Sequence, residues 1–264
     1  TALVDRVDNP DEMKKTLAEF DRFNLTHTPN FEPRRGPAVP NYVAAAKAPL
    51  LFMPIPGGPN HQIQDWLAAL DDVSAEALST GMNQKHLRQW LQTHPDHRSF
   101  TVLRHPLVRA HSVFCSAIWS GGPKFEPRMR EGLTRQFKLK LPRDPSAATA
   151  DEQRHAFSFF LDFARANIAG QTALGPHAAL CSQSSALSGF GEFALPDLVL
   201  REDELPHMLP LLTKLAGRSV SPYLPASQTD TPFTLSNIYD AELEKKVAQV
   251  YRRDYLLFGF GSWR

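Results

Sequence analysis

Short apolar runs alternate along this chain with segments whose apolar residues recur at helical spacing. The runs lie at residues 50–55, 99–103 and 197–201, and each has the length of a buried strand. After the first run, apolar residues recur every three or four positions from Ile63 to Leu70. Strands that alternate with helices usually pair in parallel, so the chain is predicted to form an α/β fold, a parallel sheet flanked by helices in a single domain.

The N-terminal region is predicted to be separate from this fold. Asn9 followed by Glu12 is a typical helix start, in which the Asn side chain caps the first turn. The segment after this helix is rich in proline, which is typical of a surface arm. Residues 1–48 are therefore predicted to form an N-terminal helix and arm, and residues 49–264 to form the α/β domain.

Residues typical of helix starts and ends predict several further helices in the rest of the chain. Thr149 and Glu152 form a capping box, and Gly170 ends the helix that follows. Other helices are predicted around residues 83–92, 107–119, 205–212 and 239–258, and residues 120–148, rich in Pro, Gly and basic side chains, are predicted to form a long excursion.

Composition excludes several classes of protein. Hydrophobic residues make up 42% of the chain, which is enough for a full core, and the net charge of +1 is too small for a broad nucleic-acid surface. Two cysteines exclude a disulfide framework and a Cys-rich zinc site. No apolar run approaches the length of a membrane span, and no basic region followed by an apolar one marks a secretory signal. A cytoplasmic protein with no nucleic-acid partner and no membrane span is expected.

Residues 101–114 carry the sharpest chemical signal. Arg104 ends a predicted strand, at the edge of the sheet where ligands of open α/β folds bind. Ser112 follows in the next helix, and the two side chains are predicted to hold one phosphate. The alternative is that Arg104 pairs with a local carboxylate and that Ser112 lies on an ordinary helix face.

The order of residues in this segment resembles the 3′-phosphate-binding motif of the sulfotransferase superfamily, particularly the carbohydrate sulfotransferases. The pattern is an apolar strand and Arg104, then Pro106 and Arg109, and finally Ser112 beside Phe114. The resemblance implies a P-loop-like fold and transfer of a sulfuryl group from 3′-phosphoadenosine 5′-phosphosulfate to a hydroxyl of a sugar or oligosaccharide acceptor. It also implies that Arg104 and Ser112 hold the 3′-phosphate of this nucleotide.

Three other segments resemble the same family. Residues 250–260 resemble its closing helix, and residues 198–205 resemble its third strand and the acidic turn that follows. The stretch from His177 to Gln183, Ser184 and Ser185 resembles a family segment with a His near Pro-Gln. His177 follows Gly175 and Pro176 in a predicted loop and is a candidate to face the acceptor; the alternative is a surface-loop histidine.

The loop after the first strand departs from the family pattern. The family places a Lys there, and this chain has Gly57; its Gly-Thr-Ser positions are Asn60, His61 and Gln62 here. Together with Gly58 these residues are the predicted site for the 5′-phosphosulfate, because a glycine turn before a helix N-terminus favours an anion.

A replacement for the missing lysine charge is needed for catalysis. His61 is the first candidate, either as an imidazolium that supplies charge or as a neutral base that takes the acceptor proton. Arg34, Arg35 and Lys124 are alternative sources of charge. A non-catalytic nucleotide-binding or scaffolding protein on the same fold is the competing interpretation.

Two further classes are disfavoured. A P-loop kinase ranks third, because the chain has no Gly-Lys-Ser or Gly-Lys-Thr sequence. No metal is expected, because His94 and His97 have a plausible spacing but no third ligand in a metal-binding pattern.

Overall fold

The computed structural model describes residues 14–15, 18, 41–121, 124–190, 195–226 and 233–264. The chain divides into two compact units. Among the residues after position 40 that the structure describes, the sheet unit contains those within 41–104 and 187–226, and the helical unit contains those within 105–186 and 233–264. The boundary predicted at residues 48 and 49 is not tested by this division and stays a prediction.

The sheet unit is built on four strands in the order β1 (Val43–Ala44), β2 (Leu50–Phe52), β3 (Arg98–Leu103) and β4 (Leu198–Arg201). β2, β3 and β4 are parallel, as predicted from the three apolar runs. β1 is antiparallel to β2, so the prediction of an entirely parallel sheet was wrong and the sheet is mixed. A strand of two residues is too short to leave a periodic pattern in the sequence.

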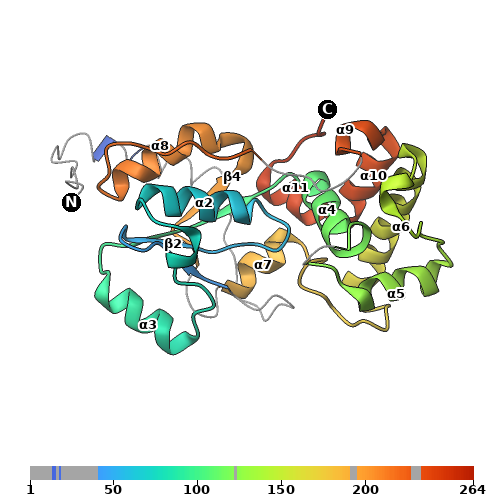
Figure 1. Ribbon diagram of the computed structural model, residues 1–264, viewed down its shortest axis with the longest axis horizontal. Coiled ribbons are helices and arrows are strands. Elements are labelled where there is room, and N and C mark those ends of the chain that lie inside the picture. The colour runs from blue at the N-terminus through green and yellow to red at the C-terminus, as the bar shows by residue number, and fades with distance from the viewer. Residues whose placement is uncertain (1–13, 16–17, 19–40, 122–123, 191–194, 227–232) are drawn as a thin grey trace. The chain divides into compact units, whose positions relative to one another are not determined.

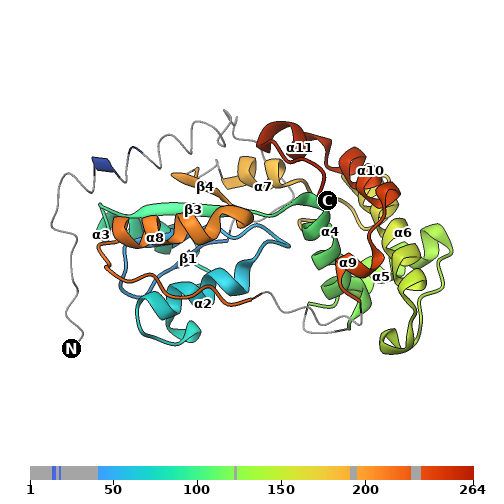
Figure 2. The same ribbon diagram turned by 90° about the horizontal axis from the view of Figure 1, so that it is seen from above.

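Two helices cover one face of this sheet. α2 (Asn60–Leu70) and α8 (Leu205–Leu215) lie along it in Figures 1 and 2. Trp66 of α2 is fully buried, and the rings of Phe52 and Phe100 are 5.2 Å apart on neighbouring strands. Four further short elements belong wholly or partly to this unit. They are η1 (Ala75–Ala77) and α3 (Gln84–Thr93) between β2 and β3, the last four residues of α7 (Gln183–Phe190) before β4, and η4 (Glu202–Glu204) after β4.

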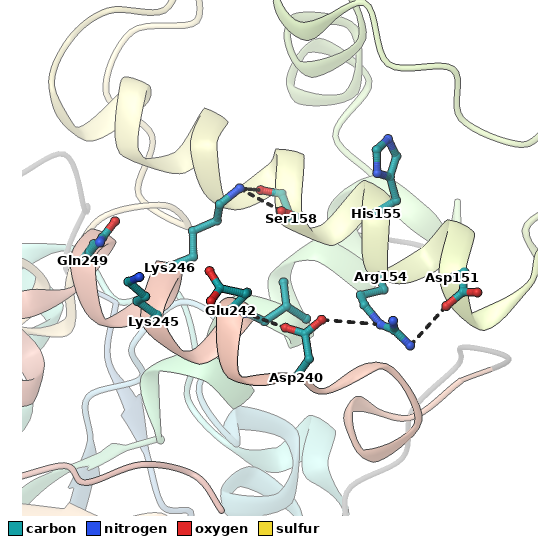
Figure 3. Close-up of a pocket in the computed structure, with 10 residues that line it drawn as sticks. Asp151, Arg154, His155, Ser158, Asp240, Glu242, Lys245, Lys246 and Gln249 are labelled. Carbon is teal, nitrogen blue, oxygen red and sulfur yellow. Dashed lines mark hydrogen bonds and ion pairs between the residues drawn. The ribbon is translucent and has the colours of Figure 1, made fainter.

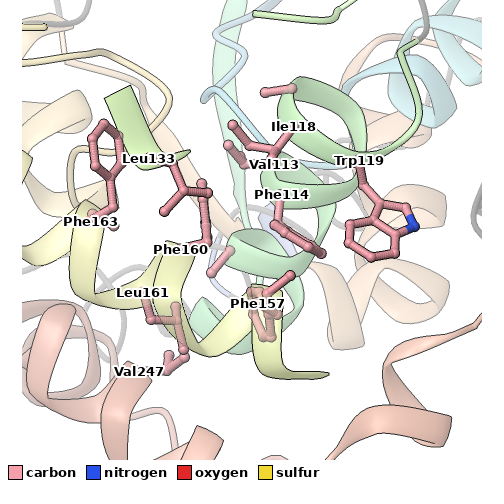
Figure 4. Packing of buried hydrophobic residues seen from close by; sticks show 14 of the residues in the cluster. Val113, Phe114, Ile118, Trp119, Leu133, Phe157, Phe160, Leu161, Phe163 and Val247 are labelled. Carbon is pink, nitrogen blue, oxygen red and sulfur yellow. The ribbon is translucent and has the colours of Figure 1, made fainter. Parts of the chain in front are cut away.

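The helical unit has an aromatic core. Phe114, Phe157 and Phe160 are fully buried, and their ring centroids lie 5.3 to 6.2 Å apart (Figure 4). The elements of the unit are α4 (Pro106–Phe114), η2 (Cys115–Trp119), α5 (Pro127–Phe137), η3 (Pro145–Ala147), α6 (Ala150–Ile168), α9 (Leu235–Ile238), α10 (Ala241–Val250) and α11 (Arg252–Phe258).

Several predicted helices are confirmed. The capping box of Thr149 and Glu152 is formed at the start of α6, and Gly170 follows its end with a positive φ of 70°. The predicted helix at 107–119 is α4 continued by η2, which is a π-helical turn. The predicted helix at 239–258 is divided at Tyr251, whose φ of −110° and ψ of 32° end α10 before α11 begins.

The excursion predicted at 120–148 contains a helix, α5, which its composition did not predict. Met129 and Leu133 are buried one turn apart, whereas the exposed face of α5 is highly charged. The predicted N-terminal cap at Asn9, together with Arg34 and Arg35, lies outside the described residues.

Candidate functional site

The carboxyl ends of the three parallel strands bring together one group of residues in the sheet unit. β2 leads into the loop before α2, β3 ends just before Arg104, and β4 ends just before Glu202. Ligands of α/β sheets bind outside this edge. The edge therefore defines the candidate site, which contains the glycine loop, Arg104 and Glu202.

The loop turns sharply before α2. Gly57 has a φ of 79°, a conformation that glycine adopts without strain. The N–H of Gly58 donates to the Ile55 carbonyl at 2.9 Å, and the Asn60 side-chain amide donates to the same carbonyl at 2.9 Å. A Cβ on Gly58 would lie 3.0 Å from that oxygen and 3.1 Å from Asn60 Oδ1, so a larger residue would displace the turn.

The N-terminus of α2 has the electrostatic character of an anion site. The N-cap residue is Pro59, which offers no side-chain oxygen to the first N–H groups, and the first turn contains no acidic residue. The first N–H groups of a helix have no intrahelical acceptor, and the helix dipole is positive at this end. His61 is exposed there, and the side chain of Gln62 is half-buried.

Arg104 joins the three strand ends. Its Nε donates to Glu202 Oε2 at 2.7 Å and its Nη2 to Glu202 Oε1 at 2.6 Å, which makes a bidentate ion pair. Nη1 also donates to the Gly57 carbonyl at 3.3 Å, and Nη2 donates to Gln62 Oε1 at 3.4 Å. The Gln62 amide in turn donates to the Pro225 carbonyl at 2.6 Å.

The predicted placement of the loop is confirmed. Residues 57–62 lie at the N-terminus of the helix that contains Trp66, and Gly57 and Gln62 both contact Arg104. The alternative prediction for Arg104 was a partner carboxylate, and the structure shows one, because Glu202 binds the guanidinium. Ser112 is half-buried in α4 of the helical unit. Its predicted sharing of one phosphate with Arg104 stays a prediction.

His177 has a local structural role in the helical unit. Its backbone N–H donates to Asn167 Oδ1 at 2.9 Å, and its ring Nδ1 accepts the Ala179 N–H at 3.2 Å. His105 likewise caps α4 by accepting the Leu107 N–H, and its Nε2 donates to the Gly261 carbonyl at 3.0 Å. The acceptor role of His177 stays a prediction.

A buried polar cluster in the helical unit connects α11 with the start of α7. Asp254 is fully buried, and its carboxyl oxygens accept the N–H groups of Gln183 and Ser184 at 2.8 and 2.9 Å. Burial raises the pKa of this carboxyl, while the Ser184 bond and the charge of Arg109 act in the opposite direction. Because Asp254 occupies the N-terminus of α7, that helix end is not available to an external anion.

His111, Cys115 and Gln153 form a second buried group. Gln153 Nε2 donates to the Phe233 carbonyl at 3.0 Å and lies 3.3 Å from His111 Nε2, which therefore accepts a hydrogen bond. The Cys115 sulfur is 3.4 Å from the same nitrogen. Desolvation lowers the pKa of His111 to about 4, so the imidazole is neutral at neutral pH and is too weak a base to ionise the thiol.

The helical unit also carries an open groove of about 760 Å³ between α6 and α10 (Figure 3). Its charged side chains largely satisfy one another. Arg154 lies 3.2 Å from Asp151, and Lys246 donates to Ser158 Oγ at 2.8 Å (Figure 3). We interpret it as a solvated helix–helix surface.

Sequence reasoning missed Glu202 as a member of the candidate site. The sequence of residues 198–205 predicts a strand and an acidic turn, and the signal for Glu202 is a carboxylate directly after a parallel strand. No group of three metal-ligating side chains exists within the described ranges. Every helix in those ranges is also too short or too polar to traverse a bilayer.

Comparison with known proteins identified no relative of this chain. No family model matches the chain, and no curated protein or solved structure is significantly similar to it. The structure itself defines the class: an α/β protein with a candidate anion site at the carboxyl edge of its sheet.

Proposed function

We propose that the protein is a sulfotransferase that uses 3′-phosphoadenosine 5′-phosphosulfate and a carbohydrate-type hydroxyl acceptor. The observation that carries the proposal is the contact of the Arg104 guanidinium with the glycine loop at the N-terminus of α2. This arrangement supports recognition of an anion, and the order of residues 101–114 favours the nucleotide donor over other anions. A P-loop-like relationship of the sheet is part of the same proposal.

In the proposed reaction the acceptor oxygen forms a bond to sulfur while the bond between sulfur and the 5′-phosphate oxygen breaks. The electron pair of the broken bond stays on the phosphate oxygen, and the acceptor proton passes to a base. The products are a sulfate ester and 3′-phosphoadenosine 5′-phosphate. Positioning and stabilisation of the developing charge are the main tasks of the protein, as in phosphoryl transfer.

A second candidate is a non-catalytic nucleotide-binding or scaffolding protein. It is favoured by two observations: Gly57 stands where the sulfotransferase pattern has Lys, and Arg104 is already paired with Glu202. The loss of one electrostatic donor typically lowers kcat by about 10²–10³-fold. This candidate predicts nucleotide binding without turnover.

Calorimetry with 3′-phosphoadenosine 5′-phosphate, followed by a radiolabelled sulfuryl-transfer assay on a panel of sugars, tests both candidates. Binding together with transfer supports the sulfotransferase. Tight binding without transfer to any sugar supports the non-catalytic protein. The absence of binding contradicts the sulfotransferase and the nucleotide-binding protein alike, and it leaves only a scaffolding role on the same fold.

His61 is expected to act as the base. It is exposed in the first turn of α2, and its imidazole can accept the acceptor proton there. We expect His61→Ala to lower kcat about 10²-fold. Unchanged kcat in His61→Ala would exclude His61 from the mechanism.

A further inference from the structure

The candidate donor site lacks a side-chain charge at the position where the sulfotransferase pattern places lysine, because Gly57 occupies that position. We propose that Arg104 supplies this charge and binds the 5′-phosphosulfate end of the donor, as the catalytic cation of the site. This inference rests on the proposed function, and it differs from the role that the resemblance gives to Arg104, which is to hold the 3′-phosphate.

The contacts of Arg104 place its charge at the loop itself. Nη1 bonds to the carbonyl of Gly57, the residue that stands in the lysine position, at 3.3 Å. Nη2 lies 3.4 Å from the side-chain oxygen of Gln62, in the first turn of α2. An anion bound at the first N–H groups of α2 would therefore lie beside this guanidinium.

The two edges of the guanidinium are bonded very differently. The Nε and Nη2 edge is held by Glu202 at 2.7 and 2.6 Å, whereas the contacts made toward the loop are 3.3 and 3.4 Å, at the weak end of the hydrogen-bond range. An anion can replace the long contacts without displacing Glu202. Glu202 thus acts as a positioning residue that fixes the orientation of the fork.

Burial strengthens the effect of this charge. The Arg104 side chain is 5% exposed and the Glu202 side chain 27%, so the guanidinium lies in a largely water-free surrounding, where Glu202 offsets part of its charge. Electrostatic attraction is stronger in a less polar surrounding. During transfer, negative charge develops on the oxygen that leaves sulfur, and a fixed guanidinium beside it stabilises the transition state.

Binding of three nucleotides distinguishes the two possible roles of Arg104, contact with the 5′ group and contact with the 3′ group. Adenosine 5′-phosphate carries only the 5′ group, adenosine 3′-phosphate carries only the 3′ group, and 3′-phosphoadenosine 5′-phosphate carries both. Each is titrated by calorimetry into the wild type, Arg104→Ala, Arg104→Lys and Arg88→Ala. Arg88 is an exposed arginine on α3 and provides the matched control.

We expect Arg104→Ala to weaken binding of adenosine 5′-phosphate and of the bisphosphate at least tenfold, about 1.4 kcal/mol, and to leave adenosine 3′-phosphate unchanged. Arg104→Lys should restore part of the loss, because it keeps the charge but not the planar fork. Arg88→Ala should match the wild type with all three nucleotides.

A loss confined to adenosine 3′-phosphate and the bisphosphate would overturn the inference and leave the proposed function standing. Failure of the wild type to bind any of the three nucleotides would overturn both. Because Arg104→Ala leaves Glu202 without its partner, Arg104→Ala/Glu202→Ala is measured in parallel, and the thermal melting of each variant shows that it is folded. If the double variant binds adenosine 5′-phosphate as tightly as the wild type, the inference is wrong.

Discussion

Replacing Asp254 with alanine is expected to lower the free energy of unfolding by about 4 kcal/mol, since each buried N–H group left without an acceptor costs about 1–3 kcal/mol. Two such groups are affected, those of Gln183 and Ser184, and both bond to the carboxyl oxygens at less than 3 Å. The loss is also expected to unravel the first turn of α7, because the capping interaction disappears.

Urea unfolding followed by circular dichroism measures this effect. Asp254→Asn keeps one acceptor oxygen, so about half of the loss is expected. Asp96→Ala removes an exposed aspartate from the turn before β3 and is the matched control, with no measurable change expected. Equal stability of Asp254→Ala and the wild type would show that the carboxyl does not cap α7.

Acidification is expected to destabilise the protein through His111. Its pKa is lowered by burial to about 4, whereas an unfolded histidine titrates near 6.5. Between about pH 6.5 and pH 4 the unfolded chain therefore binds a proton at this position that the folded chain does not, and the free energy of unfolding falls as pH is lowered. A difference of this size corresponds to about 3 kcal/mol.

The contribution of His111 is isolated by comparing pH series of urea unfolding for the wild type and His111→Gln. The variant keeps an acceptor for the Gln153 amide but no titrating ring, so we expect its free energy of unfolding to fall about 3 kcal/mol less between pH 7 and pH 4. His155→Gln removes an exposed imidazole from α6 and serves as the control. Parallel pH curves for the wild type and His111→Gln would contradict the assignment.

The local elements of the fold follow from the sequence because their causes are local. The three apolar runs predict β2, β3 and β4, and the Thr149 capping box predicts the start of α6. Elements with a weak local signal were missed. β1 has two residues, and α5 has a buried face of two hydrophobic side chains within a highly charged helix. Their formation depends on partners that are distant in the sequence.

In the candidate site too, some features follow from local residue order and others depend on tertiary contacts. The glycine turn, the helix start after it and Arg104 at a strand end are all readable from residue order. The pairing of Arg104 with Glu202 is not, since 98 positions separate the two residues and only the parallel alignment of β3 with β4 brings the strand ends together. The same holds for Asp254, whose place at the start of α7 depends on a contact across 71 positions. Sequence thus determined which residues begin, end and cap the elements, because those interactions reach only a few positions. Tertiary structure decided which charges meet, because strand pairing and helix packing alone bring remote side chains within hydrogen-bonding distance.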